Sequence, residues 1–526
     1  MRLNHIRPVP SLTAGILLLL LGAGCQTHTQ QTAGIAEQRA AGNLVAVVNE
    51  TNKRADDQQD KRDEVVWRLD QGSTLRVAAL AGMKDPSKVP SIVDPKKAPK
   101  PVEGQPPAPP PTAAEIRAHY LKASQAAFDR AEQRIEKFDE EAKTKVGEEV
   151  AAALTNLASI PYKGRYYDRV MMNTYKALTY LEMGDSDKAR VELNRAYQRQ
   201  VDAEADAKKR TEDAAAEAEK AKRGEVKDEK GKAAAYDTDK ALADQKAGPA
   251  LGNTLAESTP NAIPLYPNYQ NPFTMFLYGL YYVHKGQDGE DWGRGLKAFE
   301  SLNALFPENE FVKADKEMAD KRAQGSAPDK LTYVIVETGS SPARVETRID
   351  IPTFIVTSKL AYVGAAFPKL VYNNNYIKEI PVKAGESTFK PVLIGSMDSV
   401  IATEFKNEWP TVVTKTLIST ATKAIIQAAI QKELNERGGQ MVGFLGGLAL
   451  GAAAQAMTIA DTRSWQTLPK EFQYARFETP QDGIIEVSIG EEKLPVKLPE
   501  GAIKVVYVKV GTKASDSFVS TFALRL

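Results

Sequence analysis

The sequence predicts an α+β protein of several domains, in which pairs of helices are followed by a mainly antiparallel β domain. The spacing of apolar residues leads to this prediction, because it changes at residue 330 and again at the insert. Apolar residues recur at helical spacing through residues 33–325, and from residue 330 they alternate with polar residues, as they do along a strand. A helical stretch at 397–460 interrupts the strands and predicts an inserted helical hairpin. The 526 residues are enough for about three domains.

The first 24 residues have the features of a secretory signal peptide. A basic start precedes an apolar run over residues 12–21, and small residues then lead to Cys25, the only cysteine. This junction resembles the bacterial lipobox, although Gly22 stands where leucine is usual. The resemblance implies cleavage before Cys25, acylation of its thiol and new amino group, and a membrane anchor, with residues 25–32 as a tether. An ordinary signal peptide with an incidental cysteine is the alternative.

The residue after the cysteine bears on location. In enterobacterial sorting, which this junction resembles, a residue other than aspartate at that position implies delivery to the outer membrane. Gln26 therefore implies an outer-membrane protein that is lipid-anchored and faces the periplasm.

The helical region at 33–325 is divided by two segments of unusual composition. Residues 86–111 are rich in proline, which prevents a helix and favours extended polyproline. This linker is either a stiff spacer or a docking strip for an aromatic groove. Residues 201–248 are mostly Ala, Lys, Glu, Asp and Arg with almost no large apolar residue, so no coiled-coil seam is expected. We expect a solvated helical arm or a partly disordered insertion there.

Two stretches of this region match the pattern of small and large residues found in tetratricopeptide (TPR) repeats, one at 175–196 and one at 278–307. In such repeats small residues let two antiparallel helices approach closely. Stacked helix pairs then leave a concave surface that holds peptides or partner proteins. A helical scaffold that holds nothing is the alternative. The repeat-helix tyrosines that we expect at a protein-binding surface are Tyr175, Tyr180, Tyr278 and Tyr282.

The predicted β domain spans residues 330–526, and its helical insert holds four glycines at a spacing of four residues. Small residues at this spacing give a smooth helix face for close backbone contact, as in pairs of membrane helices. The run at 441–460 has no charged residue and is long enough to span a bilayer. The insert is predicted either to form a buried hairpin on the sheet or to mediate membrane insertion or oligomerisation. The glycines concerned are Gly439, Gly443, Gly447 and Gly451.

A structural loop is predicted to close this hairpin. Asp461 and Arg463 can pair, and Trp465 can anchor the loop on the sheet. A catalytic role for Asp461 is the alternative, but an Asx-turn or a salt bridge is favoured.

Composition and motifs give little support to catalysis or to a nucleic-acid partner. The chain has four histidines and one cysteine, and no serine-centred motif or phosphate-cradling glycine loop is present in the sequence. We therefore predict no catalytic residue, no metal and no cofactor. The 69 basic residues are balanced by 68 acidic ones, whereas nucleic-acid-binding proteins usually have a basic excess.

Several short motifs together resemble an uncharacterised family of bacterial lipoproteins that joins a TPR-like helical region to a C-terminal β domain. The motifs are Tyr162-Lys163-Gly164, Tyr175-Lys176-Ala177-Leu178, Ala189-Arg190-Val191-Glu192, Asn271-Pro272-Phe273 and the segment Asp461–Trp465. Some members are encoded near a lipoprotein activator of penicillin-binding proteins, which implies a role in the cell envelope. The Pro-rich and Ala-rich segments are additional to the family pattern.

The expected function is that of an outer-membrane-anchored periplasmic lipoprotein. It would act as a non-catalytic scaffold for envelope proteins, or as an accessory factor in envelope assembly such as peptidoglycan synthesis. The alternatives are a structural oligomer or pore-associated component assembled through the Gly-rich helix, and a periplasmic hydrolase.

Overall fold

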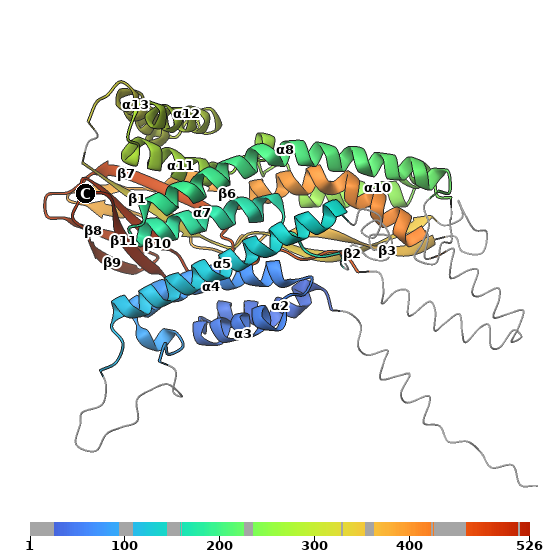
Figure 1. Ribbon diagram of the computed structural model, residues 1–526, viewed down its shortest axis with the longest axis horizontal. Coiled ribbons are helices and arrows are strands. Elements are labelled where there is room, and N and C mark those ends of the chain that lie inside the picture. Colours follow the sequence, from blue (N-terminus) through green and yellow to red (C-terminus); the bar gives the residue numbers. More distant parts are fainter. Residues whose placement is uncertain are drawn as a thin grey trace, which may run out of the picture.

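The protein is an α+β structure in which long helices run beside one another. The two larger sheets lie at one end, and the β2–β3 ribbon runs along the long axis (Figure 1). The computed structural model describes residues 26–526 except 94–108, 145–157, 159, 226–234, 328–329, 353–361, 422–423, 425–458 and 514–515. This confirms the α+β class predicted from the change in hydrophobic period.

The helices precede most of the strands in the chain. They are α2 (His28–Ala40), α3 (Leu44–Asp57), α4 (Glu64–Lys84), α5 (Ala113–Thr144), α7 (Tyr166–Glu182), α8 (Ser186–Lys222), α9 (Thr238–Leu242), α10 (Ala247–Ser258), α11 (Pro272–Lys285), α12 (Gly289–Leu305) and α13 (Glu310–Ala323). Short 3-10 turns lie at Pro86–Lys88 and Pro267–Tyr269. A further helix occupies residues 397–421, inside the predicted insert.

The strands form three sheets among the described residues. They are β1 (Leu331–Thr338), β2 (Ala343–Pro352), β3 (Tyr362–Val371), β4 (Val382–Ala384), β5 (Ser387–Phe389), β6 (Val392–Ser396), β7 (Glu471–Glu478), β8 (Ile484–Ile489), β9 (Glu492–Lys497), β10 (Ile503–Lys509) and β11 (Phe518–Arg525). The five-stranded sheet has the order β11-β10-β1-β7-β6, the four-stranded sheet has the order β5-β4-β8-β9, and β2 and β3 form a ribbon. Only the β1–β10 pair of these described strands is parallel.

The five-stranded sheet is covered on both faces, and alternate residues of β1 show this. Tyr333 and Ile335 belong to the large apolar core that the sheet shares with the helices. Val334 and Val336 belong to a second core, which the five-stranded sheet shares with the four-stranded sheet. All eight residues of β1 are therefore buried, as expected of a central strand.

The helical region and the sheet share one core. Phe273 at the start of α11 stacks on Phe472 of β7 with ring centroids 3.7 Å apart. Trp67 of α4 and Tyr507 of β10 belong to the same apolar cluster. The large core thus continues across residue 330, and the domain boundary predicted there stays a prediction.

The predicted tether at 25–32 is shorter in the structure, because α2 begins at His28. Thr27 caps the helix and forms a capping box with Gln30. The first turn of α2 is also bonded to distant parts of the chain, since the Thr29 hydroxyl donates to the Arg344 carbonyl oxygen. Residues 28–32 are thus part of the folded body.

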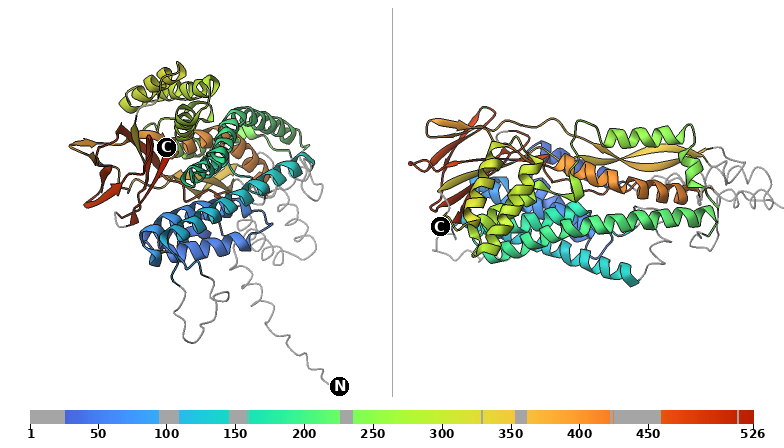
Figure 2. Two further views of the ribbon diagram at one scale, coloured as in Figure 1. Left: turned by 60° about the vertical axis from the view of Figure 1, so that its left-hand side comes forward. Right: turned by 90° about the horizontal axis from the view of Figure 1, so that it is seen from above.

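The predicted insertion at 201–248 begins as the second half of α8, which is one continuous helix. Ala203, Ala214 and Ala221 are buried, and Ala221 packs on Ile418 of the helix at 397–421. Figure 2 shows these two helices side by side along the long axis of the molecule. The α8 side of this contact is a small alanine, so it does not appear in the sequence as a stripe of large apolar residues.

Candidate functional site

Several predicted site residues lie outside the described residues. These are the lipidation site Cys25 and the helix-packing glycines Gly439, Gly443, Gly447 and Gly451. Their roles stay predictions. Within the described part of the chain, no helix combines the length and apolar character needed to cross a bilayer.

The four tyrosines predicted at a protein-binding surface lie mainly in the core. Tyr175, Tyr278 and Tyr282 are buried, and Tyr180 is partly buried against the core. Tyr175, for example, packs against the rings of Phe128 and Trp465. The three buried rings have little surface for a partner, and the protein-binding role of these tyrosines stays a prediction. Large residues at TPR spacing fill the space between helices, and that role buries them.

α8 exposes three large apolar side chains, and the sequence analysis missed them. Val191, Tyr197 and Val201 expose 49%, 48% and 53% of their surface. The Tyr197 ring stacks on the buried Tyr278 of α11 with centroids 5.1 Å apart, which holds it in place. Charged neighbours on α8 masked these residues in the sequence pattern. We call Val191, Tyr197 and Val201 the α8 surface.

The loop after the insert is held by an ion pair between the buried Arg463 and the partly buried Asp461. Arg463 Nε lies 2.7 Å from Asp461 Oδ1, and Arg463 Nη2 donates to Oδ2 at 3.0 Å. Burial alone would raise the pKa of Asp461, but the Arg463 guanidinium outweighs it and holds that pKa below its ordinary value. Arg463 also pairs with Asp63, just before α4, at 2.9 Å. The loop is thus tied to the helical region.

Trp465 anchors this loop on helices, whereas the sequence predicted an anchor on the sheet. Its ring centroid lies 5.7 Å from that of Phe128 in α5 and 5.8 Å from that of Tyr175 in α7. Its indole Nε1 donates to Ser73 Oγ of α4 at 2.9 Å. A tryptophan with its N–H satisfied is well suited to such a buried junction.

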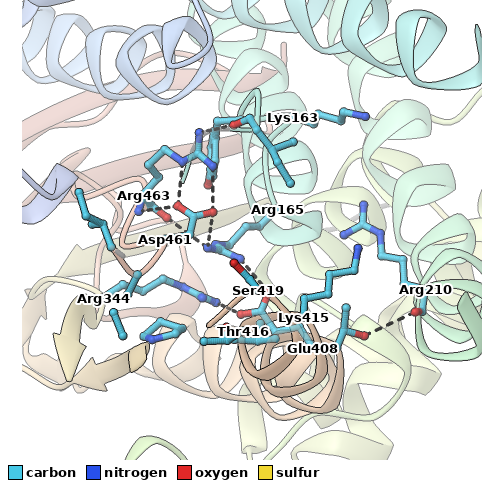
Figure 3. Close-up of a pocket in the computed structure, with 18 of the residues that line it drawn as sticks. Lys163, Arg165, Arg210, Arg344, Glu408, Lys415, Thr416, Ser419, Asp461 and Arg463 are labelled. Atoms are coloured by element: carbon cyan, nitrogen blue, oxygen red, sulfur yellow. Dashed lines mark hydrogen bonds and ion pairs between the residues drawn. The ribbon is translucent and has the colours of Figure 1, made fainter. Parts of the chain in front are cut away.

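A pocket of about 340 Å³ lies beside this loop, between the start of α7, the C-terminal half of α8, the helix at 397–421 and β2 (Figure 3). It is lined by six basic and four acidic residues, together with smaller polar and apolar ones. The charged residues are Lys163, Arg165, Arg210, Arg344, Lys415, Arg463, Asp213, Glu404, Glu408 and Asp461. The lining therefore has an excess of two positive charges if all ten groups are ionised.

Glu408 joins two arginines of the pocket wall. Arg165, at the N-cap of α7, places Nη1 at 2.7 Å from Glu408 Oε2. Arg344 of β2 pairs through Nη2 with the other carboxylate oxygen. Arg165 Nη2 also lies 3.8 Å from Asp461 Oδ2. Because each residue comes from a different element, the ion pairs fix the shape of the wall.

Glu404 is held at the N-terminus of α7. Its two oxygens accept hydrogen bonds from the backbone N–H groups of Tyr166 and Tyr167, each at 3.0 Å. Burial, followed by the neighbouring Glu408, raises the pKa of Glu404 to about 7. The backbone donors at this helix start are thus already occupied by a carboxyl group.

Some polar atoms of the wall have no hydrogen-bond partner among the described residues. They are Nε of Arg165, Nε of Arg344 and Oγ1 of Thr420. Arg344 and Thr420 are 1% and 2% exposed. A buried donor without a partner is costly, so each of these atoms would gain from a hydrogen bond to a ligand or water.

Two further basic residues of the lining form no ion pair with any residue that the structure describes. Arg210 lies over the Tyr166 ring, 4.9 Å from its centroid, and Lys415 lies on the helix at 397–421. Figure 3 shows both side chains at the side of the pocket near α8. The arrangement therefore suits binding of an anionic group.

The described residues contain no group of three or more His, Cys, Asp or Glu that could hold a metal ion. Comparisons of the chain with protein-family models, with curated proteins and with solved structures found no match. The functional argument therefore depends on the chain's own geometry.

Proposed function

We propose that the protein is an outer-membrane lipoprotein on the periplasmic face, anchored through acylated Cys25. It acts there as a non-catalytic scaffold or accessory factor for envelope proteins, as in peptidoglycan synthesis. In this proposal the helix pairs α7–α8 and α11–α12 are the degenerate TPR-like repeats, since they coincide with the two stretches that match the repeat pattern.

One observation carries the proposal of a membrane-surface protein. The folded body begins at His28, only three residues after Cys25, and its first turn is bonded to β2 through Thr29. A lipid anchor at Cys25 would therefore hold the body directly against the bilayer surface. Such an arrangement suits a protein that acts on partners at the membrane.

The α8 surface supports the proposal of a scaffold. Its three apolar side chains are each about half exposed, and an exposed aromatic ring such as that of Tyr197 is typical of contact sites. Basic residues flank it, including Arg195 and Arg199, whose guanidinium groups pair with Glu132. We propose that a periplasmic envelope protein binds here.

The anchor is tested by the mass of the mature protein. We expect the wild-type protein to start at Cys25 and to carry acyl chains, and Cys25→Ser to lose them and leave the membrane fraction. The matched variant Gln26→Asp should stay acylated but move to the inner membrane. An unmodified Cys25 in the mature protein would rule out the anchor.

The scaffold is tested by placing a photo-crosslinking residue at Tyr197 or Val201 in the full-length protein. We expect adducts with one envelope protein, identified by mass spectrometry. Glu310, whose side chain is 79% exposed on α13, is the matched control position and should give none. Equal adducts at the control position, or none on α8, would contradict the proposal. A ladder of self-crosslinks would instead favour the structural oligomer predicted from the glycine spacing.

A further inference from the structure

We propose that the pocket between α7, α8, β2 and the helix at 397–421 binds the phosphate-bearing headgroup of an anionic membrane phospholipid. The inference extends the proposed function, because it rests on the anchor at Cys25. It adds a second contact with the membrane, made by the folded body itself.

The pocket has the donors that a phosphate group needs. The wall offers three polar atoms without a partner among the described residues, namely Nε of Arg165, Nε of Arg344 and Oγ1 of Thr420. Arg344 is 1% exposed, and its guanidinium is held in place by Glu408. A phosphate oxygen that accepts from such fixed donors forms a charge-assisted hydrogen bond.

Two cationic side chains that no ion pair among the described residues holds in place lie beside these fixed donors. Arg210 and Lys415 form no ion pair with the described residues, and both line the pocket. Three of the four carboxylates of the wall, by contrast, are already engaged: Glu408 and Asp461 by arginines, and Glu404 by backbone N–H groups of α7. Only the exposed Asp213 of α8 then stands against these two cations. The charge left for a ligand is therefore positive.

The chain connects this pocket closely to the lipidation site. Thr29 donates its hydroxyl to the backbone oxygen of Arg344, and its N–H donates to Thr462 Oγ1 at 3.4 Å. Cys25 precedes Thr29 by four residues, so the two Cα atoms are at most about 14 Å apart even in an extended chain. The headgroup layer on one side of a bilayer is about 5–7 Å thick. An acylated Cys25 therefore brings the pocket within reach of that layer.

The size of the pocket fits a headgroup better than a whole lipid. Its volume of about 340 Å³ lies at the low end of small-molecule pockets, which span about 300–1,000 Å³. Part of the lining is apolar, including Val412 and Pro368, which can contact the glycerol carbon atoms. The chemistry recognised is thus a phosphate diester on a small polar group.

The test uses the full-length, lipidated protein in a neutral detergent. Short-chain phosphatidylglycerol, short-chain phosphatidylcholine, glycerol phosphate and inorganic phosphate are each titrated, and the thermal unfolding midpoint is measured. We expect phosphatidylglycerol to raise the midpoint most, because ligands that bind the folded state stabilise it. Intact mass of the same sample reports acylation of Cys25, so failure of the anchor and failure of the pocket can be told apart.

Two variants examine the pocket without breaking its ion pairs. Arg210→Gln/Lys415→Gln should weaken phosphatidylglycerol binding about tenfold or more, because two cations are lost. The control Lys208→Gln/Lys209→Gln removes two exposed cations of α8 that do not line the pocket and should bind as wild type. Thr420→Val removes a hydroxyl without a partner among the described residues. It should weaken binding about two- to tenfold while leaving the unfolding midpoint without ligand unchanged or higher.

The outcomes separate the possible ligands. Selective stabilisation by phosphatidylglycerol, lost in the pocket variants only, supports the proposal. Equal stabilisation by inorganic phosphate or glycerol phosphate would show a site for a soluble phosphate and overturn the lipid assignment. Equal stabilisation by phosphatidylcholine, equal loss in the control, or no stabilisation by any of the four compounds would overturn the pocket as a headgroup site.

Discussion

Lys176 is a buried lysine that is paired with three carboxylates. Its side chain is 2% exposed in α7, and its Nζ lies 2.8 Å from Asp129, 2.7 Å from Glu132 and 3.0 Å from Glu192. The partners come from α5 and α8, so one ammonium group joins three helices. Burial by itself would raise the pKa of Glu132, but Lys176 outweighs it and the pKa falls to about 2.

Replacing Lys176 with methionine should destabilise the protein strongly. The variant leaves two buried carboxylates without their main cation, and breaking a buried pair in this way costs about 3–5 kcal/mol. Unfolding by urea, followed by circular dichroism, measures the loss. Lys188→Met is the matched control. The Lys188 side chain is 64% exposed, and its contacts with Asp185 and the Tyr180 ring are at the surface, so the midpoint should stay nearly unchanged. Equal losses of stability in the two variants would show that burial does not make the Lys176 ion pairs more important than a surface pair.

His28 should make stability depend on pH. Its side chain is buried at the start of α2 against Trp67, and burial lowers its pKa to about 4 from an ordinary 6.5. Between these values the unfolded chain binds a proton that the folded protein does not. The free energy of unfolding contributed by this group therefore falls as pH drops from 6.5 to 4, by at most about 1.4 kcal/mol per pH unit.

The measurement compares wild type with His28→Gln across this pH range. Buried Asp70 and Asp315, whose pKa values burial raises to about 6, act in the opposite direction in both proteins, so only the difference between the proteins is informative. That difference should shrink on acidification. His119→Gln, at an exposed position of α5, should show no such trend. A constant difference for His28→Gln would show that protonation of His28 does not oppose folding.

At the scale of elements, the approach of α11 and α12 depends on glycine. A Cβ atom on Gly295 of α12 would lie 2.7 Å from Val283 Cγ2 and 2.9 Å from the Val283 backbone nitrogen in α11. The second contact involves backbone, which cannot simply rotate away. We therefore expect Gly295→Ala to destabilise the protein by about 1–3 kcal/mol, as overpacking does.

Gly293 provides the control within the same helix. A Cβ atom there would meet nothing within 4 Å, so Gly293→Ala should be neutral or stabilising by up to about 1 kcal/mol through helix propensity. Thermal unfolding of the two variants in parallel gives the comparison. Stabilisation by both substitutions would show that the helices separate at no cost.

The same pair of helices shows what the sequence can and cannot predict. Small residues such as Gly295 mark a close helix approach, and the alternation at β1 marks a strand, so the α+β class follows from local pattern. The packed side of α8 could not be recognised, because a buried alanine such as Ala221 looks the same in the sequence as an alanine on a solvated helix. Which face is buried depends on the helix at 397–421, which lies far along the chain.

The pocket could not be predicted from the sequence for a related reason. Its charged residues come from separate stretches of the chain, near Lys163, Arg210, Arg344, Glu408 and Asp461. In a chain with 26% charged residues none of these stands out. Only the spacing of Asp461 and Arg463 indicated an ion pair. The second partner of Arg463, Asp63, lies about four hundred positions away in the chain.

At the scale of the whole molecule, the shared core predicts that helices and sheet unfold together. The apolar cluster extends from α4 and α11 into β1, β7 and β10 without interruption. Proteins of this size often unfold in separate steps when their parts have separate cores. Here the amides of β1 and of α4 should exchange hydrogen through the same global opening, which exchange monitored by mass spectrometry can measure.

A variant at the contact between the two parts provides the decisive measurement. Phe273→Ala removes the ring of α11 that stacks on Phe472 of β7, and loss of a buried phenylalanine costs about 3–5 kcal/mol. If the core is one unit, this loss should accelerate exchange in β1 and in α4 by the same factor. Tyr197→Ala, on the exposed face of α8, should change neither. Faster exchange in the sheet alone would mean that the helical region is stable by itself, as the predicted boundary at residue 330 would require.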